Sequence, residues 1–178
     1  TGYTFSGWNT ESNGTGTAYK NGDDIQVNSS IVLYAQWTPI EYTITYTLDG
    51  GTVAGANPTS YTVESEDFTL CNPTKPGHTF RGWIGSNGTT AQTSVTVVKG
   101  STGNKAYTAV WSVNEYTIQF VNEDGTELQS GKVAYGETPV YSGETPTKAA
   151  DDQYTYTFTG WTPDVVAVTG NATYTATY

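Results

Sequence analysis

Hydrophobic and polar residues alternate with a period of two in short segments along the chain. In residues 42–48, Tyr, Ile, Tyr and Leu occupy every second position, and Thr occupies the positions between them. Residues 116–120 repeat the pattern with Tyr, Ile and Phe. Because successive side chains of a β-strand point to opposite faces, the pattern predicts strands with one buried face and one face in water.

Three segments of this kind recur in a constant order. A middle segment ends in Gly-Trp, and its tryptophans, Trp8, Trp83 and Trp161, are 75 and 78 residues apart. An opening segment, Glu-Tyr-Thr-Ile, begins at residues 41 and 115, and a closing segment ends at residues 37, 111 and 178. Repetition at a nearly fixed period indicates an array of similar modules. We predict three domains: the C-terminal half of a truncated repeat at 1–37, a complete repeat at 41–111, and a complete, shorter repeat at 115–178.

Turn signals lie between the predicted strands. Asp-Gly at residues 49–50 and 124–125 predicts a turn after each opening strand, because glycine accommodates the positive φ that a tight turn requires. Proline-rich crossovers follow at residues 72–76 and 145–152. The sequence leaves open a single helical turn within 144–153, with Thr147 as its N-cap.

A glycine precedes each tryptophan of the middle segments. Gly7, Gly82 and Gly160 shift the alternation by one residue, and a strand glycine beside a bulky aromatic commonly marks a β-bulge. We expect the bulge to turn the tryptophan to the same face as the preceding phenylalanine, in the core. The longer segments 9–28 and 84–105 predict variable loops or an additional hairpin, where any binding specificity would lie.

The opening Tyr-Thr-Ile, the middle Phe-x-Gly-Trp and the closing Leu-Tyr-Ala-Gln-Trp motifs resemble those of the Listeria-Bacteroides repeat family. The third repeat also resembles the B-repeats of internalin-type surface proteins. The resemblance implies a mainly β fold, a tandem array of small β-grasp-like α+β units with minimal helix and about four or more strands each. It further implies a secreted or cell-wall protein of a Gram-positive or gut bacterium, and a family without catalytic residues.

Composition excludes several classes of partner. The chain has 17 acidic and 7 basic residues and a formal net charge of −10. This charge repels phosphate backbones and anionic lipid, so we expect no nucleic-acid binding. The apolar runs are far shorter than the roughly 20 residues of a membrane-spanning helix, so we expect no membrane insertion in this segment.

Few residues are available for catalysis or metal binding. Cys71 is the only cysteine, which excludes an internal disulfide and a Cys/His zinc site, and we expect it to be buried and inert. His78 aligns with a core aromatic position and is expected to be structural. The carboxylate pairs 23–24 and 151–152 lack calcium-loop spacing and are expected to be solvated turn charges. We expect no catalytic residue, no cofactor, no metal and no enzyme activity.

Two functions remain. The first is a spacer or adhesin module of an extracellular cell-surface protein, whose partners are neighbouring repeats and a host or cell-surface glycan or protein. The alternative is a glycan- or mucin-binding module that stacks exposed aromatic rings on sugars. The candidate rings are Tyr19, Tyr34, Tyr61 and Tyr141.

The first repeat carries a separate expectation. Without an opening hairpin, it is expected to leave a sheet edge unpaired and to expose aromatic surface around Phe5, Trp8 and Trp37. We expect self-association with a neighbouring molecule, or docking on the second repeat, to cover this surface. The half repeat also predicts that the chain belongs to a longer array.

Overall fold

The computed structural model describes residues 1–178 and consists of strands joined by turns and loops. It contains no helix, and hence no helix that could cross a membrane. The prediction of a mainly β fold is confirmed. Residue contacts divide the chain into two compact units: unit 1 holds Thr1–Pro73 and Gly82–Val110, and unit 2 holds Thr74–Arg81 and Trp111–Tyr178.

The first sheet has three antiparallel strands in the order β2-β1-β3. Its strands are β1 (Tyr3–Asn9), β2 (Ala18–Tyr19) and β3 (Tyr34–Pro39). Phe5 lies opposite Trp37, and the register shifts between Phe5 and Gly7. The predicted bulge is therefore present here, and the ring centroids of Phe5 and Trp8 lie 5.3 Å apart.

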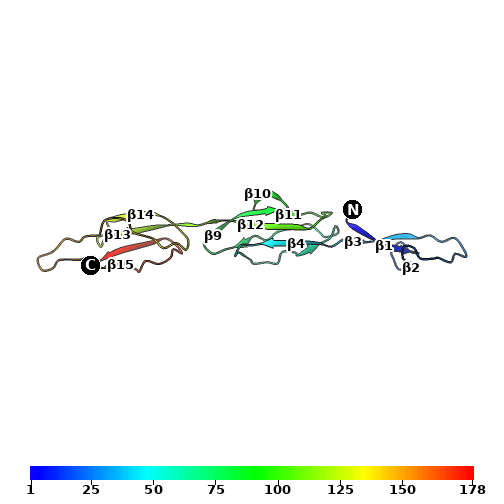
Figure 1. Ribbon diagram of the computed structural model, residues 1–178, viewed down its shortest axis with the longest axis horizontal. Helices are drawn as coiled ribbons and strands as arrows, with labels where there is room; N and C mark the ends of the chain where they lie inside the picture. Colours follow the sequence, from blue (N-terminus) through cyan, green and yellow to red (C-terminus); the bar gives the residue numbers. More distant parts are fainter. The chain divides into compact units, whose positions relative to one another are not determined.

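The second sheet has five strands in the order β10-β9-β12-β4-β6. Figure 1 labels four of them, β4, β9, β10 and β12. Its strands are β4 (Tyr42–Thr47), β6 (Ser60–Tyr61), β9 (His78–Gly85), β10 (Gly88–Gln92) and β12 (Lys105–Val113). Strands β4 and β12 run parallel, whereas β6 pairs with β4 and β10 pairs with β9 in antiparallel fashion. Two short ladders complete this part of the chain, β5 (Thr52–Val53) with β8 (Pro73–Thr74) and β7 (Phe68–Thr69) with β11 (Thr96–Val97).

The third sheet has four strands in the order β14-β13-β16-β15. Its strands are β13 (Glu115–Val121), β14 (Glu127–Ala134), β15 (Gly160–Thr162) and β16 (Ala172–Thr177). Strands β13 and β16 form a parallel central pair, and β14 and β15 flank them in antiparallel pairing.

The second and third sheets share one strand arrangement. The order β9-β12-β4-β6 corresponds to β15-β16-β13-β14, with the opening and closing strands parallel at the centre of both. The helical turn that the sequence left open within residues 144–153 is absent from the structure. The Asn122 side chain donates a hydrogen bond to the Thr147 carbonyl oxygen at 3.0 Å. The β-grasp assignment remains a prediction.

Of the two alternatives for the segments after the first two tryptophans, loops or an additional hairpin, the structure has a hairpin in both. Strand β2 pairs with β1, and β10 pairs with β9. The glycine before each of these tryptophans makes room for this extra strand: a Cβ on Gly7 would lie 2.6 Å from the Tyr19 carbonyl oxygen, and one on Gly82 would lie 2.5 Å from the Gln92 nitrogen. At Gly160, where the third sheet has no such strand, no atom lies within 4 Å of an added Cβ.

Aromatic side chains form the core of unit 1. Trp83 is fully buried, and its ring packs edge-on against Tyr46 and Tyr107 at centroid distances of 5.9 and 6.5 Å. Its Nε1 group donates to Asn72 Oδ1 at 3.1 Å. Burial, reinforced by Tyr107, raises the pKa of Tyr46 to about 12. The aromatic core predicted around this tryptophan is thus confirmed.

Unit 2 has an equivalent core. Ile118, Phe120 and Tyr174 are buried together, and Trp161 packs against Phe120 at a ring-centroid distance of 4.7 Å. Tyr141 lies 4.9 Å from Trp161 on the same side of the sheet. The opening strand and the Gly-Trp strand therefore meet through their aromatic rings, as in unit 1.

Candidate functional site

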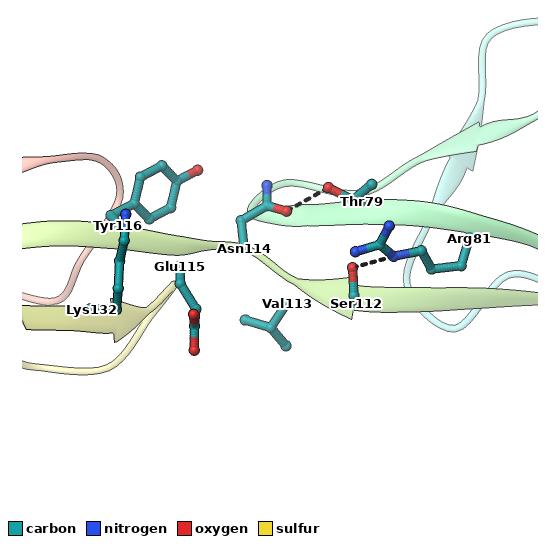
Figure 2. A pocket seen from close by; sticks show the side chains of 8 residues that line it. All are labelled: Thr79, Arg81, Ser112, Val113, Asn114, Glu115, Tyr116 and Lys132. Atoms are coloured by element: carbon teal, nitrogen blue, oxygen red, sulfur yellow. Dashed lines mark hydrogen bonds between the residues drawn. The ribbon is translucent and has the colours of Figure 1, made fainter.

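The strongest candidate for a ligand-binding site is a polar pocket of about 540 Å³ in unit 2. It is built where β9 and β13 begin and where β12 and β14 end (Figure 2). The side chains that line it are Thr79, Arg81, Ser112, Val113, Asn114, Glu115, Tyr116 and Lys132. Most of them belong to the polar, solvent-facing side of their strands.

Hydrogen bonds position the side chains of this pocket. The Arg81 Nε group donates to Ser112 Oγ at 2.8 Å, and Thr79 Oγ1 donates to Asn114 Oδ1 at 2.6 Å. Figure 2 shows the Arg81 guanidinium turned towards the centre of the pocket. The Arg81 side chain is thus oriented by a neighbouring strand before any ligand arrives.

Lys132 enters the same pocket from β14. Its Nζ group donates to Thr117 Oγ1 at 2.8 Å, across the ladder in which these two residues are partners. With Arg81 it brings two positive charges to a pocket whose single carboxylate belongs to Glu115. Arg81 is the only arginine of a chain that has a net charge of −10, so this local excess of positive charge departs from the rest of the molecule.

The groups that remain open in the pocket are mainly donors. Because Thr79 donates to the Asn114 oxygen, the Asn114 amide nitrogen is left to donate elsewhere. Ser112 accepts from Arg81, which leaves its hydroxyl proton to donate as well. Together with the terminal guanidinium nitrogens, these donors suit a ligand rich in acceptor oxygens.

A second polar pocket, of about 400 Å³, lies farther along the same strand β13. Its lining includes Thr117, Gln119, Asn171 and Thr173. Thr117 also holds Lys132, so the two pockets share a hydrogen-bonded boundary. The solvent-facing side of this sheet thus presents a run of hydroxyl and amide groups beside the two cations.

The corresponding positions of unit 1 carry no cation. Ser6 and Ser60 take the places of Arg81 and Lys132, while Thr4 takes that of Thr79. The strands that carry them have the same pairing, so the strand arrangement itself does not require the charges. Sequence reasoning missed both cations; the signal that could have found them is the single arginine in an acidic chain.

The proposed aromatic binding residues do not form one site. Tyr61 is 4% exposed, and Tyr141 packs on Phe120 and Trp161, so their assignment as exposed rings is wrong. Tyr19 is half-buried, and Tyr34 alone of the four is exposed. Both tyrosines supply a ring to a core. Because they lie outside the three recurring motifs, no pattern in the sequence marked them as core residues.

The other singled-out residues have structural contacts. Cys71 is exposed, which corrects the expectation that it is buried, and its backbone is paired with the Asn57 side chain. His78 begins β9 with its Nδ1 atom 2.8 Å from the Pro76 carbonyl oxygen. Its ring lies edge-on to Tyr135.

The two acidic pairs lie in turns, where their first members accept backbone hydrogen bonds. Asp23 Oδ2 accepts from the Lys20 amide. Asp151 accepts from the Gln153 and Tyr154 amides and from the Tyr156 hydroxyl, and these bonds, the hydroxyl first, hold the pKa of its carboxyl below the usual value. No group of three or more His, Cys, Asp or Glu side chains is arranged to hold a metal ion.

A family model matches residues 1–36 and 42–110, more than half of the chain. The model is that of the Listeria-Bacteroides repeat domain. The chain belongs to this family. The match covers most of the first and second sheets, including Gly7 and Gly82, and the third sheet lies outside the matched ranges.

Similar proteins exist in Evansella cellulosilytica and Listeria monocytogenes. A protein of Evansella cellulosilytica named as a Gly-rich membrane protein is 32% identical over 168 residues, which cover 92% of this chain and 18% of that protein. A second, named as a membrane protein, is 32% identical over 145 residues, 76% of this chain and 20% of the relative. Internalin H of Listeria monocytogenes is 38% identical over 82 residues, 46% of this chain and 14% of its own length. The Listeria-Bacteroides repeat chain described here therefore spans a fifth or less of these relatives.

Proposed function

We propose that this chain is a non-catalytic repeat segment of a bacterial cell-surface protein and acts as a spacer that carries other surfaces away from the cell. Family membership and similarity to proteins named as membrane proteins and as an internalin support a surface location. The groups that an enzyme would use are engaged in turns and strand ends: His78 with a backbone carbonyl, Asp151 with three donors.

The observation that carries the spacer proposal is a linker contact found once in each unit. In unit 1, the Ile40 amide donates to the Gly2 carbonyl oxygen at 2.9 Å, and Gly2 lies against Val63. In unit 2, the Asn114 amide donates to the Gly77 carbonyl oxygen at 2.8 Å.

Gly77 lies against the ring of Tyr135, as Gly2 lies against Val63. Short linkers held by a backbone hydrogen bond and a side-chain contact bend less than free ones. A spacer built of such repeats keeps its end-to-end length, which is the property that the proposal requires.

Pulsed electron paramagnetic resonance tests the spacer proposal within unit 1. Nitroxide labels at Asn13 and Thr90, both exposed, are attached to cysteines in a Cys71→Ser background. We expect a narrow distribution of label distances, and a broader one in a Gly2→Val variant, because any Cβ at Gly2 would overlap the Val63 side chain. A broad distribution in the parent chain, unchanged by Gly2→Val, would contradict the proposal.

A second candidate function, recognition of an acidic glycan, is favoured by the pocket of Figure 2. Arginine binds carboxylates through a two-pronged fork, and the Asn114 and Ser112 donors suit sugar oxygens. This proposal moves the binding surface from the exposed tyrosines of the loops to the polar face of unit 2. The ligand class is a saccharide that carries a carboxylate, such as a uronic acid polymer.

Titration with an oligogalacturonide, followed by amide chemical shifts, tests acidic-glycan binding. We expect shifts at Thr79, Asn114 and Lys132 that weaken with salt. Arg81→Ser should lose affinity by about 10- to 150-fold, since charge-assisted bonds of this kind are worth about 1.5–3 kcal/mol. Lys20→Ser, a cation outside the pocket, is the matched control and should leave affinity unchanged. Equal binding of a neutral galacto-oligosaccharide, or no binding at all, would refute this function.

A further inference from the structure

A neutral pocket adjoins the cationic pocket of Figure 2, which contains Arg81 and Lys132. The neutral pocket has a volume of about 400 Å³, and none of its lining residues carries a charge. These residues are Thr117, Gln119, Asn171, Ala172 and Thr173. Because Lys132 Nζ donates to Thr117 Oγ1 at 2.8 Å, one hydrogen bond borders both pockets. A ligand too long for one pocket therefore continues into the other.

The sheet of unit 2 fixes the side chains of the neutral pocket. Gln119 of β13 and Thr173 of β16 are partners in the parallel ladder, and their neighbours Phe120 and Tyr174 are buried in the core. Because the side chains of a strand alternate between its two faces, Gln119 and Thr173 point to the solvent-facing side. The pocket is therefore formed by the two central strands of the sheet.

The hydrogen-bonding groups of the neutral pocket include both donors and acceptors. Asn171 accepts a hydrogen bond from the Thr117 amide through its Oδ1 atom at 2.8 Å, which leaves its side-chain nitrogen to donate to a ligand. The Thr173 hydroxyl donates to Gln119 Oε1 at 3.4 Å, which leaves the hydroxyl oxygen to accept. A sugar hydroxyl both donates and accepts, whereas a carboxylate only accepts. The neutral pocket therefore matches an uncharged sugar better than a uronic acid.

A carboxylate of the protein lies beside the neutral pocket. Gln119 Nε2 donates to Glu127 Oε2 at 3.0 Å, and Glu127 is exposed. A ligand carboxylate in this pocket would meet the like charge of Glu127, and two like charges about 4 Å apart in water weaken binding by about fivefold. The cationic pocket differs, because Arg81 and Lys132 outnumber its single carboxylate, Glu115. The two pockets together therefore accept one charged sugar and one neutral sugar.

We propose that the two pockets select a linear polysaccharide in which uronic acids alternate with neutral sugars. The carboxylate of one sugar binds Arg81 and Lys132, and the next sugar binds the amide and hydroxyl groups of Asn171 and Thr173. This mode of binding rests on the proposed recognition of an acidic glycan and specifies the charge pattern of that glycan. Glu127 sets the specificity, since it disfavours a second carboxylate and not a neutral sugar.

Three tetragalacturonides that differ only in methyl esterification test the charge pattern on the intact chain. One is fully charged, one has alternate carboxylates esterified, and one is fully esterified. Titrations are followed by amide chemical shifts. We expect the alternating tetramer to bind about fivefold more tightly than the fully charged one and to shift the amides of Thr79, Asn114, Asn171 and Thr173. Monogalacturonate, which fills the cationic pocket alone, should shift Thr79 and Asn114 without Asn171 or Thr173.

Glu127→Gln isolates the specificity, because it removes the charge and keeps the size of the side chain. This variant should bind the fully charged tetramer about fivefold more tightly than the parent chain does, so that the preference for the alternating tetramer is lost. Asp164→Asn is the matched control, since it removes the same charge from an exposed residue that lines neither pocket, and it should keep the fivefold preference. Thr173→Val should weaken binding of the alternating tetramer by about fivefold, more than that of monogalacturonate.

The outcomes separate the charge pattern from the acidic-glycan function itself. Equal affinity for all charged probes, with shifts confined to the cationic pocket, would overturn the charge pattern and leave the acidic-glycan function standing. A fivefold preference that persists in Glu127→Gln would also overturn the charge pattern. No binding of any charged probe, or equal binding of the fully esterified tetramer, would overturn both.

Discussion

Trp8 and Trp83 occupy equivalent strand positions but differ in burial, which makes their alanine variants a matched pair. Trp83 is fully enclosed and donates a hydrogen bond to Asn72. Removal of a buried tryptophan side chain lowers the unfolding free energy by about 3–5 kcal/mol, because packing contacts are lost and a cavity is left in the core. Trp8 is 37% exposed on an open face, where no closed cavity forms, so we expect Trp8→Ala to cost about 1–2 kcal/mol.

The stability of a repeat sets the consequence of this difference. A single repeat of about 70 residues has a stability of about 3–5 kcal/mol, so Trp83→Ala should leave the five-stranded sheet largely unfolded. Trp8→Ala should leave every sheet folded. Trp83→Phe, which keeps most of the ring volume, is the intermediate control.

Amide hydrogen exchange is the suitable assay, since it reports the opening free energy of each sheet separately in a chain that need not unfold in one step. We expect protection to be lost in β4, β9 and β12 of Trp83→Ala and kept in β13 and β16. Equal losses in the two alanine variants, or a cost below about 1 kcal/mol for Trp83→Ala, would refute the assignment of this tryptophan to a closed core.

Three further outcomes follow from single sites. Gly82→Ala should lower the thermal stability more than Gly160→Ala. Both glycines have positive φ, but only at Gly82 would the new Cβ meet another strand, 2.5 Å from a backbone nitrogen. Equal losses of stability would contradict the account of the extra hairpin. The unfolding free energy of unit 1 should fall as the pH rises from about 10 to 12, because Tyr46 ionises in the unfolded chain while it stays protonated in the folded state. Tyr46→Phe should flatten this pH dependence. An unchanged slope in the variant would count against a buried hydroxyl. Asn9→Leu should lower the unfolding free energy by about 1–3 kcal/mol and make the following loop sensitive to proteolysis. The reason is that the side-chain amide of the buried Asn9 forms hydrogen bonds to the loop backbone through both its oxygen and its nitrogen. A loop that remains resistant to proteolysis would argue against this role.

The sequence predicted the strands well where side-chain alternation carries the information. Ile44 and Ile118 are buried and the threonines of β4 are exposed, as the period of two requires. Gly7 stands at an observed register shift, so the local rule for bulges also held. Both features are determined by residues that are adjacent in the sequence, so the sequence alone predicts them.

Features that depend on distant parts of the chain were harder to predict. Tyr61 and Tyr141 lie in irregular or very short elements, so no periodicity indicated that each would complete a core. Cys71 was expected to be buried on general grounds of residue type, which the local backbone pairing with Asn57 overrides. Arg81 and Lys132 line one pocket because β9 pairs with β12, β14 pairs with β13, and β12 leads directly into β13. Neither cation's own segment indicates this arrangement.

The linker hydrogen bonds test the central claim most directly, because a spacer of tandem repeats depends on linkers that hold their conformation. The Ile40 and Asn114 amides, which donate to the Gly2 and Gly77 carbonyl oxygens, can be followed individually by hydrogen exchange in the intact chain. The account predicts that both amides exchange as slowly as those of the adjoining strands β3 and β12. Exchange at both amides as fast as in an unstructured loop would contradict it.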